Sequence, residues 1–252
     1  MHLVRAELVK VRTTRLWVGL LIGGLGLAAL GTILLLVVTA SADAARNGLA
    51  PIRTADDMRG LVFSAAGSLA FVLVLAATMA TAEFRYGTAA GTYLATPDRV
   101  RVITAKTLAA VPAGFAYGAA AAVLSVLIAA VWFAVRGDAL PFGTPVASAI
   151  AQVGLQSAYA AAIGVCVGMA LRSQLVAILV LLGWVLLAEP LVTGLMPRFA
   201  KWTPLTGVQG VFGNAGDAGR SLLGPAGAGL LAVAYVALFW TAAIWLEGRR
   251  DV

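Results

Sequence analysis

Apolar residues fill six long stretches of this chain, and charged residues fall mainly in the short connections between them. A hydrocarbon core of about 30 Å takes around 20 helical residues to cross, and each stretch is at least that long. Within such a core the backbone hydrogen bonds must be made inside the segment itself, as they are in a helix. The pattern therefore predicts six transmembrane helices, over residues 16–40, 61–82, 107–135, 146–171, 175–196 and 225–246.

The composition agrees with this pattern and excludes a soluble protein. Of the 252 residues, 61% are hydrophobic and 12% are charged, whereas soluble domains have roughly 25% charged residues. The polar remainder is too small for a second domain, so we expect an all-α polytopic membrane protein with a single transmembrane domain over residues 1–252. The net charge of +7 does not indicate nucleic-acid binding, because basic residues beside apolar runs interact with membrane lipids and set orientation.

The distribution of lysine and arginine predicts the orientation. With six spans both termini share one side, which would hold eleven basic residues against seven on the other. The eleven are Arg5, Lys10, Arg12, Arg15, Arg85, Arg99, Arg101, Lys106, Arg172, Arg249 and Arg250, and the seven are Arg46, Arg53, Arg59, Arg136, Arg198, Lys201 and Arg220. Cytoplasmic connections carry the excess of basic residues, so both termini are predicted to be cytoplasmic.

Two segments outside the spans are also apolar enough to meet the membrane. In residues 1–15, Val4 and Leu8 share one helical face while Arg5 lies on another, which favours a short interfacial helix. An ordinary basic flank that fixes topology explains the same residues. Residues 197–224 are rich in glycine and proline but also apolar. We predict that this external segment re-enters the outer leaflet as a pair of short helices.

The connection over residues 83–106, EFRYGTAAGTYLATPDRVRVITAK, has the composition of a docking surface. It mixes charges with turn-forming residues, and a short surface helix fits before Pro97 because the residue preceding a proline is biased away from helix. Phe84 and Tyr86 are predicted to be exposed beside arginines, which would suit contact with a soluble protein. The alternative is a loop that sets topology and binds lipid headgroups.

Specific residues of this connection carry a family resemblance. They are Glu83, Phe84, Arg85, Gly87, Thr88, Leu94, Pro97, Arg99 and Lys106. Together they resemble the region between the second and third helices of type-2 ABC transporter permeases. The basic start resembles the interfacial connecting helix of that family, and residues 197–224 resemble its re-entrant helices.

The resemblance implies a function and a set of partners. Members are membrane subunits with six helices and no nucleotide site, and the region corresponding to residues 83–106 forms a coupling helix that seats on a separate ABC ATPase. The chain would then be the permease of an ATP-driven transporter, an exporter of a hydrophobic or amphipathic substrate in a bacterial inner membrane. A second permease copy or a homologue would complete it, and ATP and Mg would be bound by the ATPase.

The motifs that the sequence lacks agree with this role. No GxxxxGK[ST] phosphate loop occurs, so the chain has no nucleotide cradle of its own. The one histidine, His2, is at the extreme N-terminus, so an intramembrane serine–histidine dyad is not expected. The one cysteine, Cys166, lies in another part of the chain, and no carboxylate pair shares a span, so a metal site is not expected either. We therefore expect neither an enzyme nor a bound cofactor.

Glu189 is the acidic residue placed well inside a predicted span, and Pro190 follows it. A carboxylate there is costly unless it faces protein or water, so one hypothesis is a role in handling substrate or protons along the pathway. The other is that it lies near the outer surface or pairs with Arg198. Two further functions remain open: a secondary transporter that uses Glu189 to couple to an ion gradient, and a non-transporting membrane scaffold.

Pairs of glycines four residues apart occur in three of the predicted spans. They are Gly19 with Gly23, Gly114 with Gly118, and Gly164 with Gly168. Small residues at this spacing allow helix backbones to approach closely, so we interpret these pairs as sites of helix packing.

Overall fold

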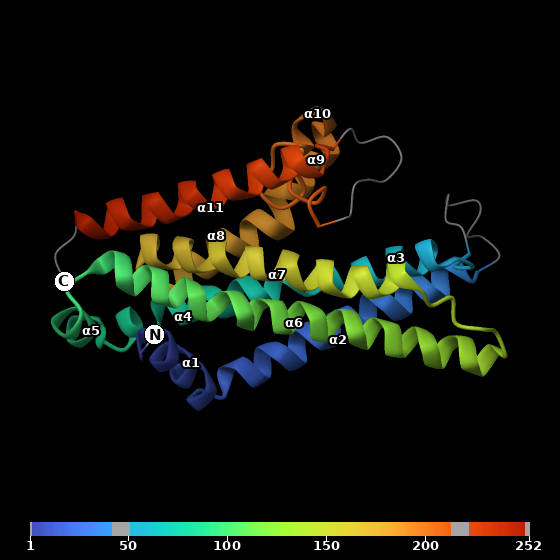
Figure 1. The fold of residues 1–252 in the computed structure, drawn as a ribbon, viewed down its shortest axis with the longest axis horizontal. Helices are drawn as coiled ribbons and strands as arrows, with labels where there is room; N and C mark the ends of the chain where they lie inside the picture. The colour runs from blue at the N-terminus through green and yellow to red at the C-terminus, as the bar shows by residue number, and fades with distance from the viewer. Residues whose placement is uncertain (1, 42–50, 213–221, 250–252) are drawn as a thin grey trace.

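The computed structural model describes residues 2–41, 51–212 and 222–249, and these residues form helices and their connections without a β-strand (Figure 1). Six segments are long and apolar enough to cross a membrane: Leu16–Thr39, Ala55–Arg85, Arg99–Arg136, Thr144–Leu171, Gln174–Leu195 and Pro225–Gly248. Each coincides with a predicted span or extends it. The all-helical fold with six spans is confirmed, and the chain is a multi-pass membrane protein.

Two of the spans are composite. The elements up to the third span are α1 (His2–Thr13), α2 (Leu16–Thr39), α3 (Ala55–Phe63), the 3₁₀ turn η2 (Ser64–Ser68), α4 (Leu69–Arg85), α5 (Ala89–Ala95) and α6 (Arg99–Arg136). The remaining elements are α7 (Thr144–Leu171), α8 (Gln174–Gly183), the π-helical turn η3 (Trp184–Ala188), α9 (Glu189–Leu195), α10 (Pro197–Ala200) and α11 (Pro225–Gly248). The second span thus runs through α3, η2 and α4, and the fifth through α8, η3 and α9.

Local capping explains why two spans begin earlier than the apolar pattern predicts. Thr54 and Asp57 form a capping box that starts α3, and Asp98 accepts a hydrogen bond from the backbone of Arg101 at the start of α6. Such caps satisfy N–H groups that a helix leaves unpaired at its first turn. Helix α6 then continues for 38 residues through Pro112, a length of about 57 Å.

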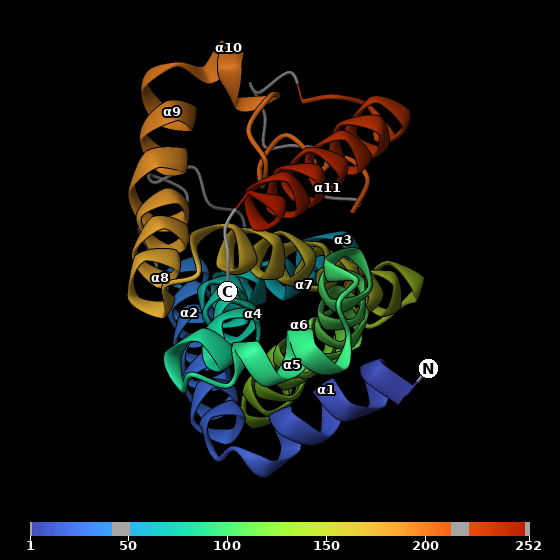
Figure 2. The same ribbon diagram turned by 90° about the vertical axis from the view of Figure 1, so that its left-hand side faces the viewer.

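The helices lie in three layers, with α7 in the middle layer beside α3 and α4 (Figures 1 and 2). Helices α8 to α11 lie on one side of α7, and α1, α2 and α6 on the other. One end of the bundle carries α1, α5 and the last turn of α11, and we call it the α5 end. The opposite end carries α3 with the last turns of α2 and α6, and we call it the α3 end.

Glycines set the close packing of α7 against α4 and α6. A methyl group on Gly118 of α6 would lie 2.7 Å from the carbonyl oxygen of Val153, and one on Gly168 of α7 would lie 2.7 Å from the Cβ of Ala80. Their partners Gly114 and Gly164 are equally confined, which agrees with the predicted packing role. Gly19 differs, because no neighbour lies near its position within this chain.

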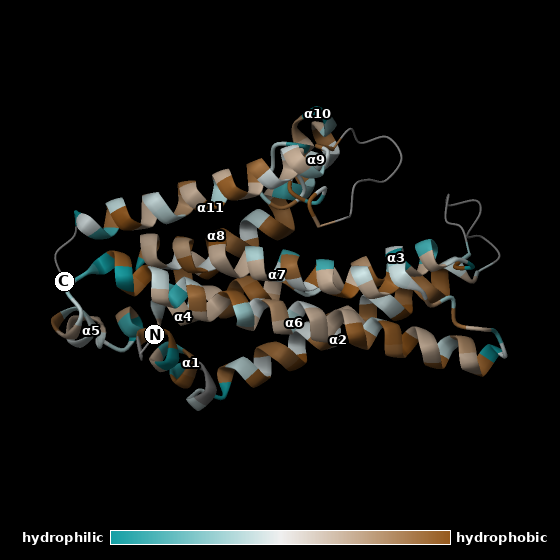
Figure 3. Ribbon diagram, viewed as in Figure 1, coloured by the Kyte–Doolittle hydropathy of each residue, from teal (hydrophilic) through white to brown (hydrophobic). Residues whose placement is uncertain are grey.

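The outer helices turn apolar surface away from the protein. In the most apolar stretch of α7, 83% of the residues are buried, whereas in that of α11 only 6% of them are. Hydrophobic residues cover the length of the long helices, while hydrophilic residues concentrate at α1 and at the helix ends, such as the start of α6 (Figure 3). Such a surface is stable when lipid surrounds it.

The two segments outside the spans have partly the predicted structure. A helix forms over His2–Thr13, and its position at the membrane interface stays a prediction. Residues 197–212 form one short helix, α10, and then turns, rather than a pair of helices within this range. Leu205 and Phe212 from these turns pack against Tyr159 near the middle of α7. Re-entry into the membrane stays a prediction, and Arg46, Arg220 and Arg250 lie outside the described residues.

Candidate functional site

The predicted docking connection between the second and third spans folds into a short helix. Gly87 has φ = 69°, a backbone conformation that glycine adopts without strain, and it lets the chain turn after α4. The backbone N–H of Thr88 then donates to the carbonyl of Glu83 at 2.9 Å. Helix α5 follows over Ala89–Ala95 and ends before Pro97, as the sequence predicts.

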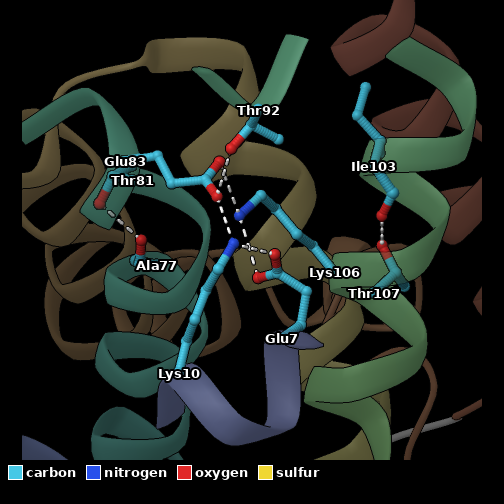
Figure 4. Close-up of polar contacts among 9 residues, drawn as sticks. All are labelled: Glu7, Lys10, Ala77, Thr81, Glu83, Thr92, Ile103, Lys106 and Thr107. Carbon is cyan, nitrogen blue, oxygen red and sulfur yellow. Dashed lines mark hydrogen bonds and ion pairs between the residues drawn. The ribbon is translucent and has the colours of Figure 1, made fainter. Parts of the chain in front are cut away.

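Four charged side chains form a closed cluster against the inner side of α5 (Figure 4). Lys10 Nζ lies 2.6 Å from Glu7 Oε1 and 2.5 Å from Glu83 Oε1. Lys106 Nζ lies 3.1 Å from Glu7 Oε2 and 3.1 Å from Glu83 Oε2. Each lysine therefore bridges both glutamates, and the cluster joins α1, α4 and α6. We call these four residues the four-charge cluster.

The four-charge cluster is balanced in charge, and three of its four members are buried. Lys106 is 1% exposed, and Glu7 and Glu83 are each 7% exposed. Two positive and two negative groups cancel, so the site avoids the penalty of an unpaired buried charge. Burial lowers the pKa of Lys10, but hydrogen bonds and attraction from Glu7 and Glu83 outweigh burial and leave that pKa above its usual value. The ionised form of Lys10 is therefore favoured in the folded chain.

The hydroxyl of Thr92 connects the four-charge cluster to α5. Thr92 Oγ1 donates to Glu83 Oε1 at 3.0 Å, so α5 is held against the carboxylate that already pairs with both lysines. A displacement of α5 would therefore act directly on the partners of Glu83.

A second buried carboxylate holds the next residue of α5. Glu247, in the last turn of α11, is 1% exposed. It accepts a hydrogen bond from the Tyr93 hydroxyl at 2.8 Å and pairs with Arg172, whose Nε lies 2.6 Å from Glu247 Oε2. We call Tyr93, Arg172 and Glu247 the α11 anchor. Burial and the neighbouring Glu247 raise the pKa of Tyr93, which keeps its hydroxyl protonated as a donor.

The predicted site residues divide into an inner and an outer set. Glu83 and Lys106 face the interior of the chain in the four-charge cluster. Arg85, Gly87, Thr88 and Pro97 are exposed. Arg99 is half-buried, with its guanidinium 5.7 Å from the centre of the Tyr93 ring. The structure brings all of these residues to the α5 end of the bundle.

The prediction of an exposed Phe84 is wrong. Its ring is half-buried in an apolar contact with Ala89, Tyr93 and Val102, and the guanidinium of Arg172 lies 5.5 Å from the ring centre. Phe84 is drawn inward because α5 folds back over it. Tyr86 is exposed as predicted, at 70%, and Leu94 is 84% exposed on α5.

A cleft opens beside this connection where α7 passes into α8. It has a volume of about 560 Å³ and is lined by Phe84, Arg85 and residues 172–175 together with Ile178. Arg85 donates to the side-chain oxygen of Gln174 at 3.0 Å across it. The cleft shares Phe84 and Arg85 with the connection that leads into α5.

Sequence reasoning missed most of the groups that hold α5. Glu7, Thr92, Tyr93 and Glu247 were not singled out, and Lys10 and Arg172 were counted only for orientation. The spacing of Glu7 and Lys10 at i and i+3 on a helix was a visible signal of their pairing. The contact between Tyr93 and Glu247 spans 154 residues and left no local signal.

Glu189 lies in a separate, uncharged setting. It is 4% exposed, and its carboxylate accepts hydrogen bonds from Trp184 Nε1 at 2.8 Å, Thr203 Oγ1 at 2.9 Å, the Leu205 N–H at 3.0 Å and the Thr206 N–H. The suggested pairing with Arg198 is wrong, because in the described contacts that guanidinium lies over the ring of Phe199. Glu189 thus fastens the turns after α10 to the fifth span.

Within residues 2–41, 51–212 and 222–249, no three histidine, cysteine, aspartate or glutamate side chains gather as they would around a metal ion. The candidate site is therefore a set of charged contacts around a short helix. A scan against protein-family models finds no match to this sequence. A search of curated proteins likewise finds no relative.

Proposed function

We propose that this chain is the membrane-spanning permease subunit of an ABC transporter and that α5 is the helix that seats on the ATPase subunit. The observation that carries the proposal is the double attachment of α5. Its inner side is tied through Thr92 to the four-charge cluster and through Tyr93 to the α11 anchor. A loop that only sets topology or binds lipid headgroups has no need of two buried charged attachments.

The outer side of α5 supports contact with a soluble partner. Leu94 exposes apolar surface on α5, Tyr86 does so in the turn before it, and Arg85 lines the cleft beside α8. Aromatic residues and arginine are enriched in protein–protein interfaces. A protrusion from the ATPase would occupy the cleft while α5 enters a groove on the ATPase surface.

The attachments provide a route for the motion. ATP binding would close two ATPase subunits and displace α5. The Thr92 contact would pass that displacement to α1, α4 and α6, and the Tyr93 contact would pass it to α7 and α11. A single displacement of α5 would thus move helices in both outer layers of the bundle. Their movement would switch the pathway between inward-facing and outward-facing states.

The remaining parts of the assembly follow from this role. A second copy of the chain or a homologue completes the pathway, and ATP with Mg is bound on the partner ATPase. Both termini face the cytoplasm of a bacterium whose inner membrane holds the complex, and residues 197–212 re-enter the outer leaflet. The substrate is hydrophobic or amphipathic and is exported.

The geometry of Glu189 weighs against the alternative of ion-coupled transport through this residue. Its carboxylate is occupied by hydrogen bonds from its own chain and lines none of the larger cavities described here. An ion-coupling carboxylate must be reached by the ion from each side of the membrane in turn. The arrangement supports a role in positioning residues 203–206 instead.

Site-specific photo-cross-linking in native membranes tests the proposal. A photoreactive residue at Leu94 is compared with one at Val135, which is 83% exposed but lies at the α3 end, so the pair is matched in exposure. We expect cross-linking to an ABC ATPase from position 94 and not from position 135. Cross-linking only to lipid from position 94 would contradict the proposal, as would an ATPase captured equally from both positions.

A further inference from the structure

Two neighbouring concave surfaces lie at the α3 end, away from α5. The first is a cavity of about 690 Å³ between the last turns of α2 and α6 and the chain that leads into α3. The second is a groove of about 620 Å³ between α2 and α6. Trp132 and Arg136 line both, so the cavity continues into the groove.

The cavity has the chemistry to bind an anionic group. Arg53 and Arg136 contribute two guanidinium groups and Asp138 one carboxylate, which leaves one excess positive charge. Among the described residues, neither guanidinium forms an ion pair with an acidic side chain. The Arg136 guanidinium lies 4.4 Å from the centre of the Trp132 ring, which holds it at the junction of cavity and groove.

The groove has the chemistry to bind a hydrocarbon chain. Apart from Arg136 it is lined by apolar side chains, among them Ile33, Leu127, Val131 and Val135, which are 45%, 58%, 65% and 83% exposed. Leu127 and Val135 are eight residues apart on α6, so the groove follows the helix for about 12 Å. It runs along α6, with the charged cavity at the α3 end.

A tryptophan and arginine at the end of an apolar helix are typical of the level of the lipid headgroups. A molecule that fills both surfaces needs a negative group and an attached apolar chain in this order. A free anion would leave the groove empty, and a neutral hydrocarbon would leave the two guanidinium groups without a partner.

We propose that this composite surface is a binding site for an anionic phospholipid. Its phosphate lies between Arg53 and Arg136 in the cavity, and one acyl chain lies along α6 in the groove. Bidentate contacts suit guanidinium and phosphate groups. The site is independent of the proposed function, because it lies at the other end of the bundle and involves none of the residues that hold α5.

Native mass spectrometry of the full chain, purified in mild detergent and titrated with phosphatidylglycerol or phosphatidylcholine, tests the site. We expect tighter retention of phosphatidylglycerol, and about a tenfold loss on Arg136→Gln, the ratio that corresponds to one charged hydrogen bond. The matched control is Arg249→Gln, since Arg249 lies over Trp245 with 3.8 Å to the ring centre at the end of α11. This control is expected to retain phosphatidylglycerol as the wild type does.

Three further measurements separate the lipid from simpler occupants. Arg136→Lys keeps the charge but loses the bidentate contact, so it is expected to bind phosphatidylglycerol more tightly than Arg136→Gln and less tightly than the wild type. Val131→Phe fills the groove at an exposed position and is expected to weaken phosphatidylglycerol without changing the melting temperature. Inorganic phosphate is expected not to displace the lipid.

Equal retention of the two lipids would overturn the proposal, as would equal losses from Arg136→Gln and Arg249→Gln, which would mark ordinary headgroup contact at any helix end. Displacement by inorganic phosphate alone would also overturn it, because the groove would then contribute nothing.

Discussion

The four-charge cluster and the Glu189 site bury carboxylates in opposite ways. In the four-charge cluster, Glu7 and Glu83 are neutralised by two lysines, and the partners come from three helices far apart in the sequence. Glu189 is satisfied by neutral donors that lie within seventeen residues of it. The first arrangement joins distant parts of the chain through charge, whereas the second fastens one local turn.

This difference indicates which of the two sites can transmit a structural change to distant helices. A contact between distant helices responds when any one of them moves, and its strength depends on the protonation of its members. A carboxylate held by backbone N–H groups has no such distant partners. The four-charge cluster is therefore suited to coupling α5 with the bundle, and the Glu189 site to preserving the shape of residues 203–206.

Replacing Lys106 is expected to have the largest effect. Lys106→Met leaves Glu7 and Glu83 with Lys10 alone, and breaking a buried ion pair costs about 3–5 kcal/mol. We expect a clear fall in the melting temperature of the detergent-solubilised chain. The double variant Lys106→Met, Glu83→Gln removes one charge of each sign and should recover part of that loss.

Lys201→Met is the control for the Lys106 variant, because it removes a lysine that lies 5.8 Å from the centre of the Trp202 ring. Equal melting temperatures for Lys106→Met and Lys201→Met would show that the ion pairs of Lys106 contribute no more than an ordinary surface contact.

Replacing Glu189 is expected to have a smaller, local effect. Glu189→Gln introduces an amide N–H₂ among groups that are all donors, and an unsatisfied buried group costs about 1–3 kcal/mol. We expect faster hydrogen exchange in residues 203–212 and no change in α1 or α5. Glu7→Gln should do the reverse, with faster exchange in α1 and no change in residues 203–212. If both variants speed exchange at both sites, the contrast between the two sites is wrong.

Alkaline pH is expected to have the smallest effect and to act at the α5 end. The pKa of Lys10 is raised in the folded chain, so its contribution to stability is present below the unfolded pKa of about 10.4 and is lost as pH rises further. The raised pKa of Tyr93 acts in the same direction, above about pH 10. Lys10 is half-exposed, which limits its share.

Hydrogen exchange in α1 and α5, corrected for the intrinsic rate at each pH, measures this loss. The variant Lys10→Gln should show less additional loss above pH 10 than the wild type does, while residues 203–212 serve as an internal reference. Equal sensitivity of the reference segment would mean that the whole chain, rather than the α5 end, responds to alkali.

The six-helix fold could be predicted from hydrophobicity alone, because lipid requires every span to be apolar over about the same length. Twenty or more apolar residues mark each helix, so the six spans agree with the structure to within a few residues, except where capping residues lengthen them. Asp57 and Asp98 extend α3 and α6 beyond the apolar pattern, since a cap satisfies the first turn independently of hydrophobicity.

The site could be predicted only in part, for a related physical reason. Pro97 and Gly87 act through the local backbone, so the short helix between them was predictable. The burial of Phe84 depends on how α5 folds over the end of α4, and the lysine partners of Glu83 depend on how α1 and α6 pack beside α4. Both are properties of the assembled bundle. The four donors to Glu189 likewise arise from a turn that no periodicity describes.

The glycine contacts of the middle layer have a mechanical consequence. Where Gly118 meets the backbone of Val153, and Gly168 meets Ala80, no long side chain lies between the helices to change rotamer and absorb a displacement. Helices α4, α6 and α7 thus form one stiff unit, in which backbone atoms and short side chains make the contact on each side of α7. A displacement of α5 would therefore move α4, α6 and α7 together, and the remaining helices would shift relative to them.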